Sequence, residues 1–151
     1  MSAGSCSRLH ELPPPASTIV TTARRAVLST IDRSGDAHAV PVCFARRGDD
    51  LVTAIDQKPK ETDREPARVA NIRRHGRATL LIDRWDEDWT RLGWVMIRAA
   101  ATLEPPGSAS AELLERYPQY RDDPPAGQVI SLSPERILWW LWEADRWSPQ
   151  A

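Results

Sequence analysis

Short runs of β-branched and other apolar residues, separated by turns rich in glycine, dominate the chain and restrict it to a mainly β fold. The first two runs, residues 26–32 and 37–45, are joined by a turn that contains Gly35, which predicts a β-hairpin. Pro41 lies in the second run and has no N–H to donate, so this strand is expected at a sheet edge or at a bulge. Further strands are expected at residues 51–56, 77–83, 93–104, 128–133 and 135–142.

Helical patterns are fewer. Residues 62–75 are expected to form a helix, because Thr62 and Glu65 have capping-box spacing and Gly76 is a suitable stop. A short helix is expected at residues 109–117, and residues 17–25 are weakly helical. About seven strands with so few helices predict a small closed or partly open β-barrel rather than a doubly wound α/β sheet.

The length of 151 residues fits one domain. The three prolines at positions 13–15 indicate a flexible amino-terminal tail over residues 1–16. A single domain is then expected over residues 17–147, with a second short tail at residues 148–151.

The charge balance excludes several classes of function. A net charge of −1 argues against a nucleic-acid partner and against a polybasic membrane surface. No apolar run is long enough to span a membrane, and the first residues lack the apolar core of a signal peptide, so a cytoplasmic location is expected. Cys6 and Cys43 with three scattered histidines make no zinc pattern, and Cys43 is expected to be a small buried apolar side chain.

The distribution of lysine points to one candidate anion site. Only two of the 20 Lys and Arg residues are lysines, and both lie in Lys58-Pro59-Lys60, between a predicted strand and a predicted helix. Two ammonium groups beside a helix amino terminus favour an anion such as phosphate. The alternative is a solvated charged turn, and the acidic residues nearby reduce the local positive potential.

Tryptophan is the second unusual feature, with seven in the chain. Indoles separated by carboxylates at residues 85–89 could form a wall beside a planar cofactor, or pack a barrel end or a subunit interface. In the run at residues 138–142, alternation places Trp140 on the face of Leu138 and Trp139 on the other. A strand that is bulky on both faces is buried on both, which favours a dimer interface. No hydrolase or dinucleotide-binding motif is present.

Residues 29–44, which end in Pro-Val-Cys-Phe, are similar to the opening hairpin of the pyridoxamine-phosphate-oxidase-like split β-barrels, an FMN-binding-like fold. Lys58-Pro59-Lys60, Asp86-Glu87-Asp88-Trp89 and Trp94-Val95 resemble one actinobacterial branch of that family, the deazaflavin-dependent enzymes. The resemblance covers roughly residues 24–142, and it depends on the order and spacing of motifs that are not diagnostic singly.

The resemblance implies a homodimer that holds each cofactor in a cleft between the subunits. The cations would contact the cofactor phosphate, the apolar residues of the hairpin would lie along the ring, and an indole would close the site. The residues so assigned are Val40, Pro41, Val42, Lys58, Lys60, Arg64, Arg68, Trp89 and Trp94.

The function implied is an oxidoreductase that uses the deazaflavin coenzyme F-420 to transfer hydride to a small organic substrate, with no protein residue assigned as acid or base. Two alternatives stay open. One is an FMN-dependent oxidase or reductase of the same fold. The other is a dimer that binds flavin or haem without catalysis, because one fold hosts many activities.

Overall fold

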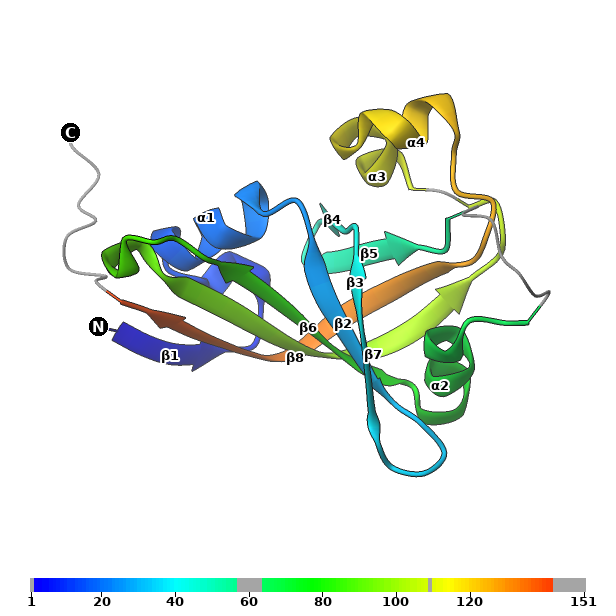
Figure 1. Cartoon of the computed structure of the whole chain (residues 1–151), viewed down its shortest axis with the longest axis horizontal. Coiled ribbons are helices and arrows are strands. Elements are labelled where there is room, and N and C mark those ends of the chain that lie inside the picture. The colour runs from blue at the N-terminus through cyan, green and yellow to red at the C-terminus, as the bar shows by residue number, and fades with distance from the viewer. Residues whose placement is uncertain (1, 57–63, 109, 143–151) are drawn as a thin grey trace.

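The computed structural model describes residues 2–56, 64–108 and 110–142. Eight strands and four α-helices make up most of this part of the chain (Figure 1). The strands are β1 (Ser2–Cys6), β2 (Ala26–Ile31), β3 (Ala37–Val42), β4 (Ala45–Arg47), β5 (Asp50–Ala54), β6 (Arg77–Arg84), β7 (Gly93–Glu104) and β8 (Val129–Leu141). The helices are α1 (Pro14–Thr22), α2 (Ala67–His75), α3 (Ala111–Arg116) and α4 (Pro118–Asp122), with single 3-10 turns η1 (Leu9–Glu11) and η2 (Trp89–Arg91).

The strands form one antiparallel sheet in the order β3-β2-β6-β7-β8-β5-β4, and β1 pairs with β8 beside this path. The sheet curls on itself (Figure 1), and the predicted mainly β split barrel is confirmed. β3 lies at one edge, so the missing N–H of Pro41 breaks no central ladder, as predicted.

Each long strand buries one face. Along β7 the residues alternate between buried and partly exposed, and its buried side chains include Val95 and Ile97. They meet Leu80, Ile82 and Ile137 from the neighbouring strands in one core. Helix α1 covers part of this inner face with buried residues near its carboxyl end. The opposite, outer face of β2, β6, β7 and β8 carries no helix in the described part of the chain (Figure 1).

Two expected boundaries differ from the structure. Residues 128–133 and 135–142 form one strand, β8, and not two. The register with β7 shifts so that Ala99 pairs with Pro134 and Arg98 with Arg136, which leaves Glu135 as the extra residue of a bulge. The bulge accommodates Pro134 in a central strand. Helix α2 begins at Ala67 rather than at residue 62, because Pro66 disfavours a helical conformation in the residue before it.

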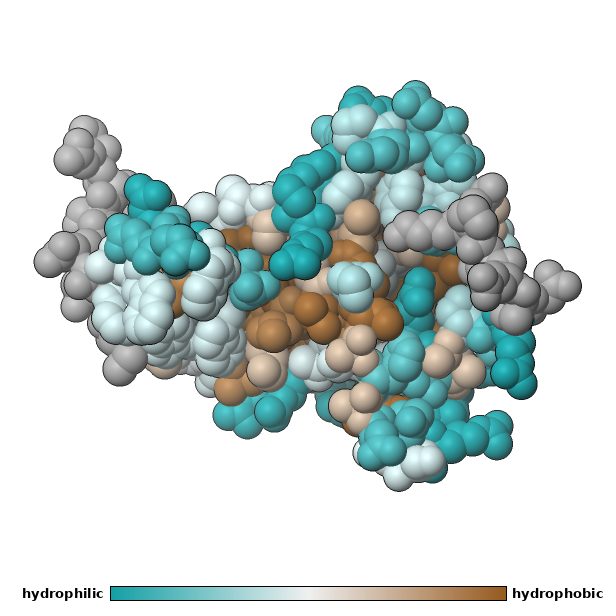
Figure 2. All heavy atoms as spheres, viewed as in Figure 1, coloured by the Kyte–Doolittle hydropathy of each residue, from teal (hydrophilic) through white to brown (hydrophobic). Residues whose placement is uncertain are grey.

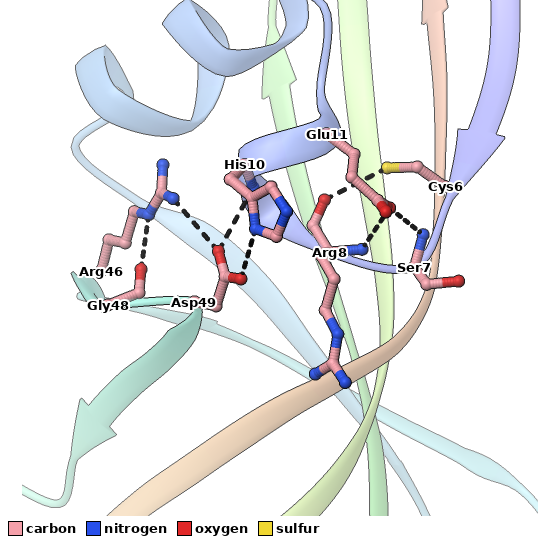
Figure 3. Close-up of polar contacts among 8 residues, drawn as sticks. All are labelled: Cys6, Ser7, Arg8, His10, Glu11, Arg46, Gly48 and Asp49. Carbon is pink, nitrogen blue, oxygen red and sulfur yellow. Dashed lines mark hydrogen bonds and ion pairs between the residues drawn. The ribbon is translucent and has the colours of Figure 1, made fainter.

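Residues 2–16 of the predicted flexible tail instead contain strand β1, the turn η1 and the start of α1. β1 extends the sheet alongside β8, with Gly4 opposite Trp139. A Cβ atom at Gly4 would lie 2.3 Å from the indole of Trp139, so only glycine lets the strand pass over this ring. The next residues are held by polar contacts (Figure 3): Nδ1 of His10 lies 2.6 Å from Oδ2 of Asp49, at the β4–β5 turn.

Acid is expected to release this amino-terminal segment. The hydrogen bond with His10 lowers the pKa of Asp49, and the backbone N–H groups of Ser7 and Arg8 lower that of Glu11. A carboxyl with a lowered pKa in the folded state stabilises it above the unfolded pKa, and this contribution is lost as the pH falls through the folded value. The hydrogen-exchange protection factors of residues 2–12 should therefore fall below pH 3.8, the ordinary value for Asp49, before those of the core.

The matched variant is Asp49→Asn, which cannot ionise. It should show reduced protection of the same segment already at neutral pH, and a weaker pH dependence. Equal protection of the segment and the core through the acid range would contradict the prediction.

Candidate functional site

A cavity of about 510 Å³ lies between β3, β5, α2 and α4. Its apolar wall comes from the end of β3 and from β5 with the residue that follows it. Its polar wall comes from α2, from the residues before it and from α4. The lining residues are Arg25, Pro41, Val42, Cys43, Ala54, Ile55, Asp56, Arg64, Pro66, Arg68 and Tyr120. Its volume is within the usual range of small-molecule sites.

Arg68 is a partly buried cation on the wall of this cavity. Burial lowers the pKa of its guanidinium, and the neighbouring Asp56 and Tyr120 partly offset this effect. Arg68 makes no hydrogen bond or ion pair with another residue that the structure describes. A partly buried guanidinium whose donors are unused favours an anionic ligand, because guanidinium groups bind carboxylate and phosphate with two parallel hydrogen bonds.

A second lobe of about 360 Å³ adjoins the cavity and shares Cys43, Asp56 and Tyr120 with it. Burial raises the pKa of Tyr120, and the nearby thiol of Cys43 raises it further. Tyr120 is therefore a neutral phenol over the physiological range. Cys43 packs against the smaller apolar cluster, as expected of a small apolar side chain, but it is only partly buried and also lies on the wall of both lobes.

The pair of helices α3 and α4 forms a cap over this second lobe, and Tyr117 attaches the cap to the sheet. The Tyr117 hydroxyl accepts a hydrogen bond from the N–H of Phe44 at 3.0 Å. It also lies 3.0 Å from the carbonyl oxygens of Phe44 and Arg24, and it donates to one of them. The Arg24 guanidinium stacks 4.8 Å above the Tyr117 ring, and the Arg116 guanidinium donates to the carbonyl of Ala23.

The structure brings part of the predicted site together. Pro41, Val42, Arg64 and Arg68 line the cavity. Val40 packs against the main core and does not line the cavity. The predicted Lys58 and Lys60 lie outside the described residues.

The two predicted indoles, those of Trp89 and Trp94, do not lie at the cavity. Trp94 lies on the outer face of β7, opposite Asp83 and Trp140, and Trp89 is 58% exposed in η2. Neither lines the cavity of its own chain, so their predicted place beside the cofactor would require a second copy.

Sequence reasoning missed Arg25, Asp56 and Tyr120. Asp56 carried one signal, because it ends a strand just before the lysine turn. Tyr120 had none of its own, because only the folded cap brings α4 to β3 and β5. Among the described residues there is no cluster of three or more His, Cys, Asp or Glu side chains that could hold a metal ion.

The sequence model of the family described as pyridoxamine 5'-phosphate oxidase matches residues 12–141. The chain belongs to this family. No curated protein sequence matches it. In the part of this family member that the structure describes, no helix is long and apolar enough to cross a membrane.

Solved structures similar to this member of the pyridoxamine 5'-phosphate oxidase family include a conserved hypothetical protein from Mycobacterium tuberculosis. It has a TM-score of 0.67 and 17% identity, over 88% of this chain and 86% of the other. An F420 reductase has a TM-score of 0.63 and 16% identity, over 83% and 98%. A heme-binding protein from Mycobacterium smegmatis has a TM-score of 0.61 and 19% identity, over 89% and 57%. At these identities the likeness shows the fold alone.

Proposed function

We propose that the chain is an oxidoreductase that binds the deazaflavin coenzyme F-420 in the 510 Å³ cavity and transfers hydride to a small organic substrate. The observation that carries the proposal is Arg68, a partly buried guanidinium that forms no hydrogen bond or ion pair with any residue that the structure describes and that lines the same cavity as Pro41, Val42 and Ile55. Membership of the pyridoxamine 5'-phosphate oxidase family and the structural likeness to an F420 reductase support it.

The residues of the cavity fit such a cofactor. Pro41, Val42 and Ile55 offer an apolar surface on which a planar ring can lie. Arg64 and Arg68 on the opposite side offer positive charge to a phosphate. The stretch that contains Lys58 and Lys60 joins Asp56 to Arg64, and both of these line the cavity, so the proposal assigns the lysines to the same phosphate.

The coenzyme would supply the hydride chemistry, and the protein would bind it, orient it and exclude water. Arg68 would fix the anionic end, while the apolar wall would hold the ring. The second lobe, with the neutral phenol of Tyr120 on its wall, would receive the substrate beside the ring. We assign no residue as a catalytic acid or base.

The assembly proposed is a cytoplasmic homodimer. Pro41 lines the cavity and also lies on the outer face of the sheet, in line with Val27 and Leu81 of the two neighbouring strands. A second copy on that face would therefore cover one side of the cavity mouth, which is the arrangement that would bring an indole such as Trp89 or Trp94 to the cofactor.

Calorimetric titration of the purified chain with F-420 and, separately, with FMN and with haem tests the proposal. F-420 is expected to bind more tightly than FMN, and the reduced coenzyme is expected to be reoxidised by a conjugated organic acceptor. The variant Lys58→Ala/Lys60→Ala should weaken binding severalfold or more, because each charge-assisted hydrogen bond contributes roughly 1.5–3 kcal/mol.

Each alternative has its own outcome in this titration. Tighter binding of FMN, or a yellow protein as purified, would replace F-420 with FMN. Binding of flavin or haem with no turnover of any acceptor would indicate a carrier or sensor. Absence of binding to any of the three would reject the proposal.

A further inference from the structure

The second lobe carries a cation of its own. Arg24 lines this lobe and not the larger cavity, whereas its neighbour Arg25 lines the larger cavity and not the lobe. Arg24 forms no ion pair with any residue that the structure describes. The coenzyme phosphate is assigned to cations of the larger cavity, so the proposed function leaves the charge of Arg24 unused.

The Arg24 guanidinium is held in a fixed position. It stacks 4.8 Å from the centre of the Tyr117 ring, and Nη2 donates a hydrogen bond to the carbonyl oxygen of Arg116 at 2.8 Å. The backbone of Arg24 is fixed as well, because its carbonyl oxygen lies 3.0 Å from the Tyr117 hydroxyl. Nε and Nη1 form no hydrogen bond with any residue in the described ranges. A guanidinium that is already ordered loses little side-chain entropy when it binds a ligand.

The rest of the lobe is mainly aromatic and uncharged. The ring centres of the buried Tyr117 and Tyr120 lie 5.6 Å apart, and Gln119 contributes an amide. Asp56 is the single carboxylate among the described lining residues. Figure 2 shows apolar side chains gathered below the hydrophilic surface of the helical cap formed by α3 and α4. A lobe of about 360 Å³ with aromatic walls suits a small flat molecule.

The charges of the lobe suit a ligand with a single negative charge. The free edge of a guanidinium binds a carboxylate through two parallel hydrogen bonds. A phosphate monoester carries roughly two negative charges at neutral pH, and one guanidinium neutralises only one of them. The remaining charge would be repelled by Asp56, which lines the same lobe. A carboxylate therefore fits this lobe better than a phosphate.

The position of Arg24 also orients the ligand. Arg24 and Gln119 line the lobe alone, whereas Cys43 and Tyr120 line both the lobe and the larger cavity. A carboxylate held by Arg24 places the rest of a flat ligand along the tyrosine rings, with its far end at the shared residues. That end lies next to the cavity assigned to the coenzyme, where a hydride acceptor has to be.

We propose that the second lobe binds a flat, conjugated monocarboxylic acid, whose carboxylate is held by Arg24 and whose conjugated end lies at Cys43 and Tyr120. Arg24 then selects the class of substrate. This assignment deepens the proposed function, and the role of the acid as substrate rests on it. The carboxylate site itself does not require the coenzyme, so binding of an acid to the chain alone tests it separately.

Calorimetric titration of the coenzyme-free chain with probes of similar shape tests the assignment. The probes are trans-cinnamate, its neutral amide trans-cinnamamide and the dianionic trans-styrylphosphonate. Cinnamate is expected to bind at least roughly tenfold more tightly than the amide, because only the carboxylate forms charge-assisted hydrogen bonds with Arg24. Cinnamate is also expected to bind more tightly than the phosphonate, which Asp56 repels.

Arg24→Gln should lower the affinity for cinnamate roughly tenfold and leave the affinity for the amide within about twofold. A loosened cap would weaken both probes together, so the ratio of the two affinities separates ligand binding from the structural contact of Arg24 with Tyr117. Arg121→Gln is the matched control, because Arg121 is exposed on α4 of the same cap and does not line the lobe. It should change neither affinity by more than about twofold.

Equal affinities for cinnamate and the amide, tighter binding of the phosphonate, or an Arg24→Gln variant that keeps the preference for cinnamate would each overturn the assignment. An equal loss for both probes in that variant would overturn it as well, because Arg24 would then only support the cap. Binding of F-420 without these preferences would leave the proposed function standing. The expected preferences in a chain that binds no F-420 would keep the carboxylate site and reject only the proposed function.

Discussion

An Arg68→Met variant is expected to bind F-420 about 10- to 150-fold more weakly than the wild-type chain, because one charge-assisted hydrogen bond is worth roughly 1.5–3 kcal/mol. The same variant should unfold at an equal or higher temperature. Burial disfavours the charged guanidinium, as the lowered pKa of Arg68 shows, and methionine removes that cost while filling a similar space. Calorimetric titration and thermal unfolding of the same preparation measure the two effects.

Weaker binding of F-420 together with an unchanged or higher unfolding temperature distinguishes a binding role of Arg68 from a structural one. Arg73→Met is the matched control, since Arg73 lies on the same helix but is exposed and pairs with Glu65 instead of facing the cavity. It should change binding by less than about twofold, as is usual for a surface substitution. An Arg68→Met chain that binds F-420 as tightly as wild type would show that Arg68 does not hold the coenzyme, and a destabilised variant would show that the guanidinium supports the fold.

A site arginine that weakens the fold is expected where function and stability compete. Arg68 has this property, because burial disfavours its charge and no residue that the structure describes forms a hydrogen bond or an ion pair with it.

The sequence predicted best those elements that depend on residues close together in the chain. Alternation and flanking turns predicted residues 93–104 as a strand, which is the extent of β7, and the hairpin around Gly35 was predicted with its edge proline. These features depend on neighbours in the chain. The candidate cavity was partly predicted for the same reason, since Pro41 and Val42 are in that hairpin and Arg64 and Arg68 precede or begin α2.

The parts that were missed depend on distant pairings. Ser2–Cys6 has no strand pattern of its own, and it becomes β1 because the edge of β8 is available and Gly4 fits under Trp139. Tyr120 enters the cavity wall because α4 folds back on the strands. The predicted place of Trp94 beside a cofactor stays a prediction, because the register of β7 puts Trp94 on the outer face of the sheet and it does not line the cavity of its own chain.

Tyr117→Phe is expected to destabilise the fold by about 1–3 kcal/mol, although it removes a single oxygen atom. The hydroxyl is buried, and its loss leaves the N–H of Phe44 and a carbonyl oxygen without their partner. For a chain of this length, the melting temperature should fall by roughly 2–12 °C. Tyr120→Phe is the control: its hydroxyl faces the Cys43 thiol, a weak hydrogen-bond partner, so its loss should cost less. Equal melting temperatures for the two variants would show that Tyr117 does not secure the helical cap beside the cavity.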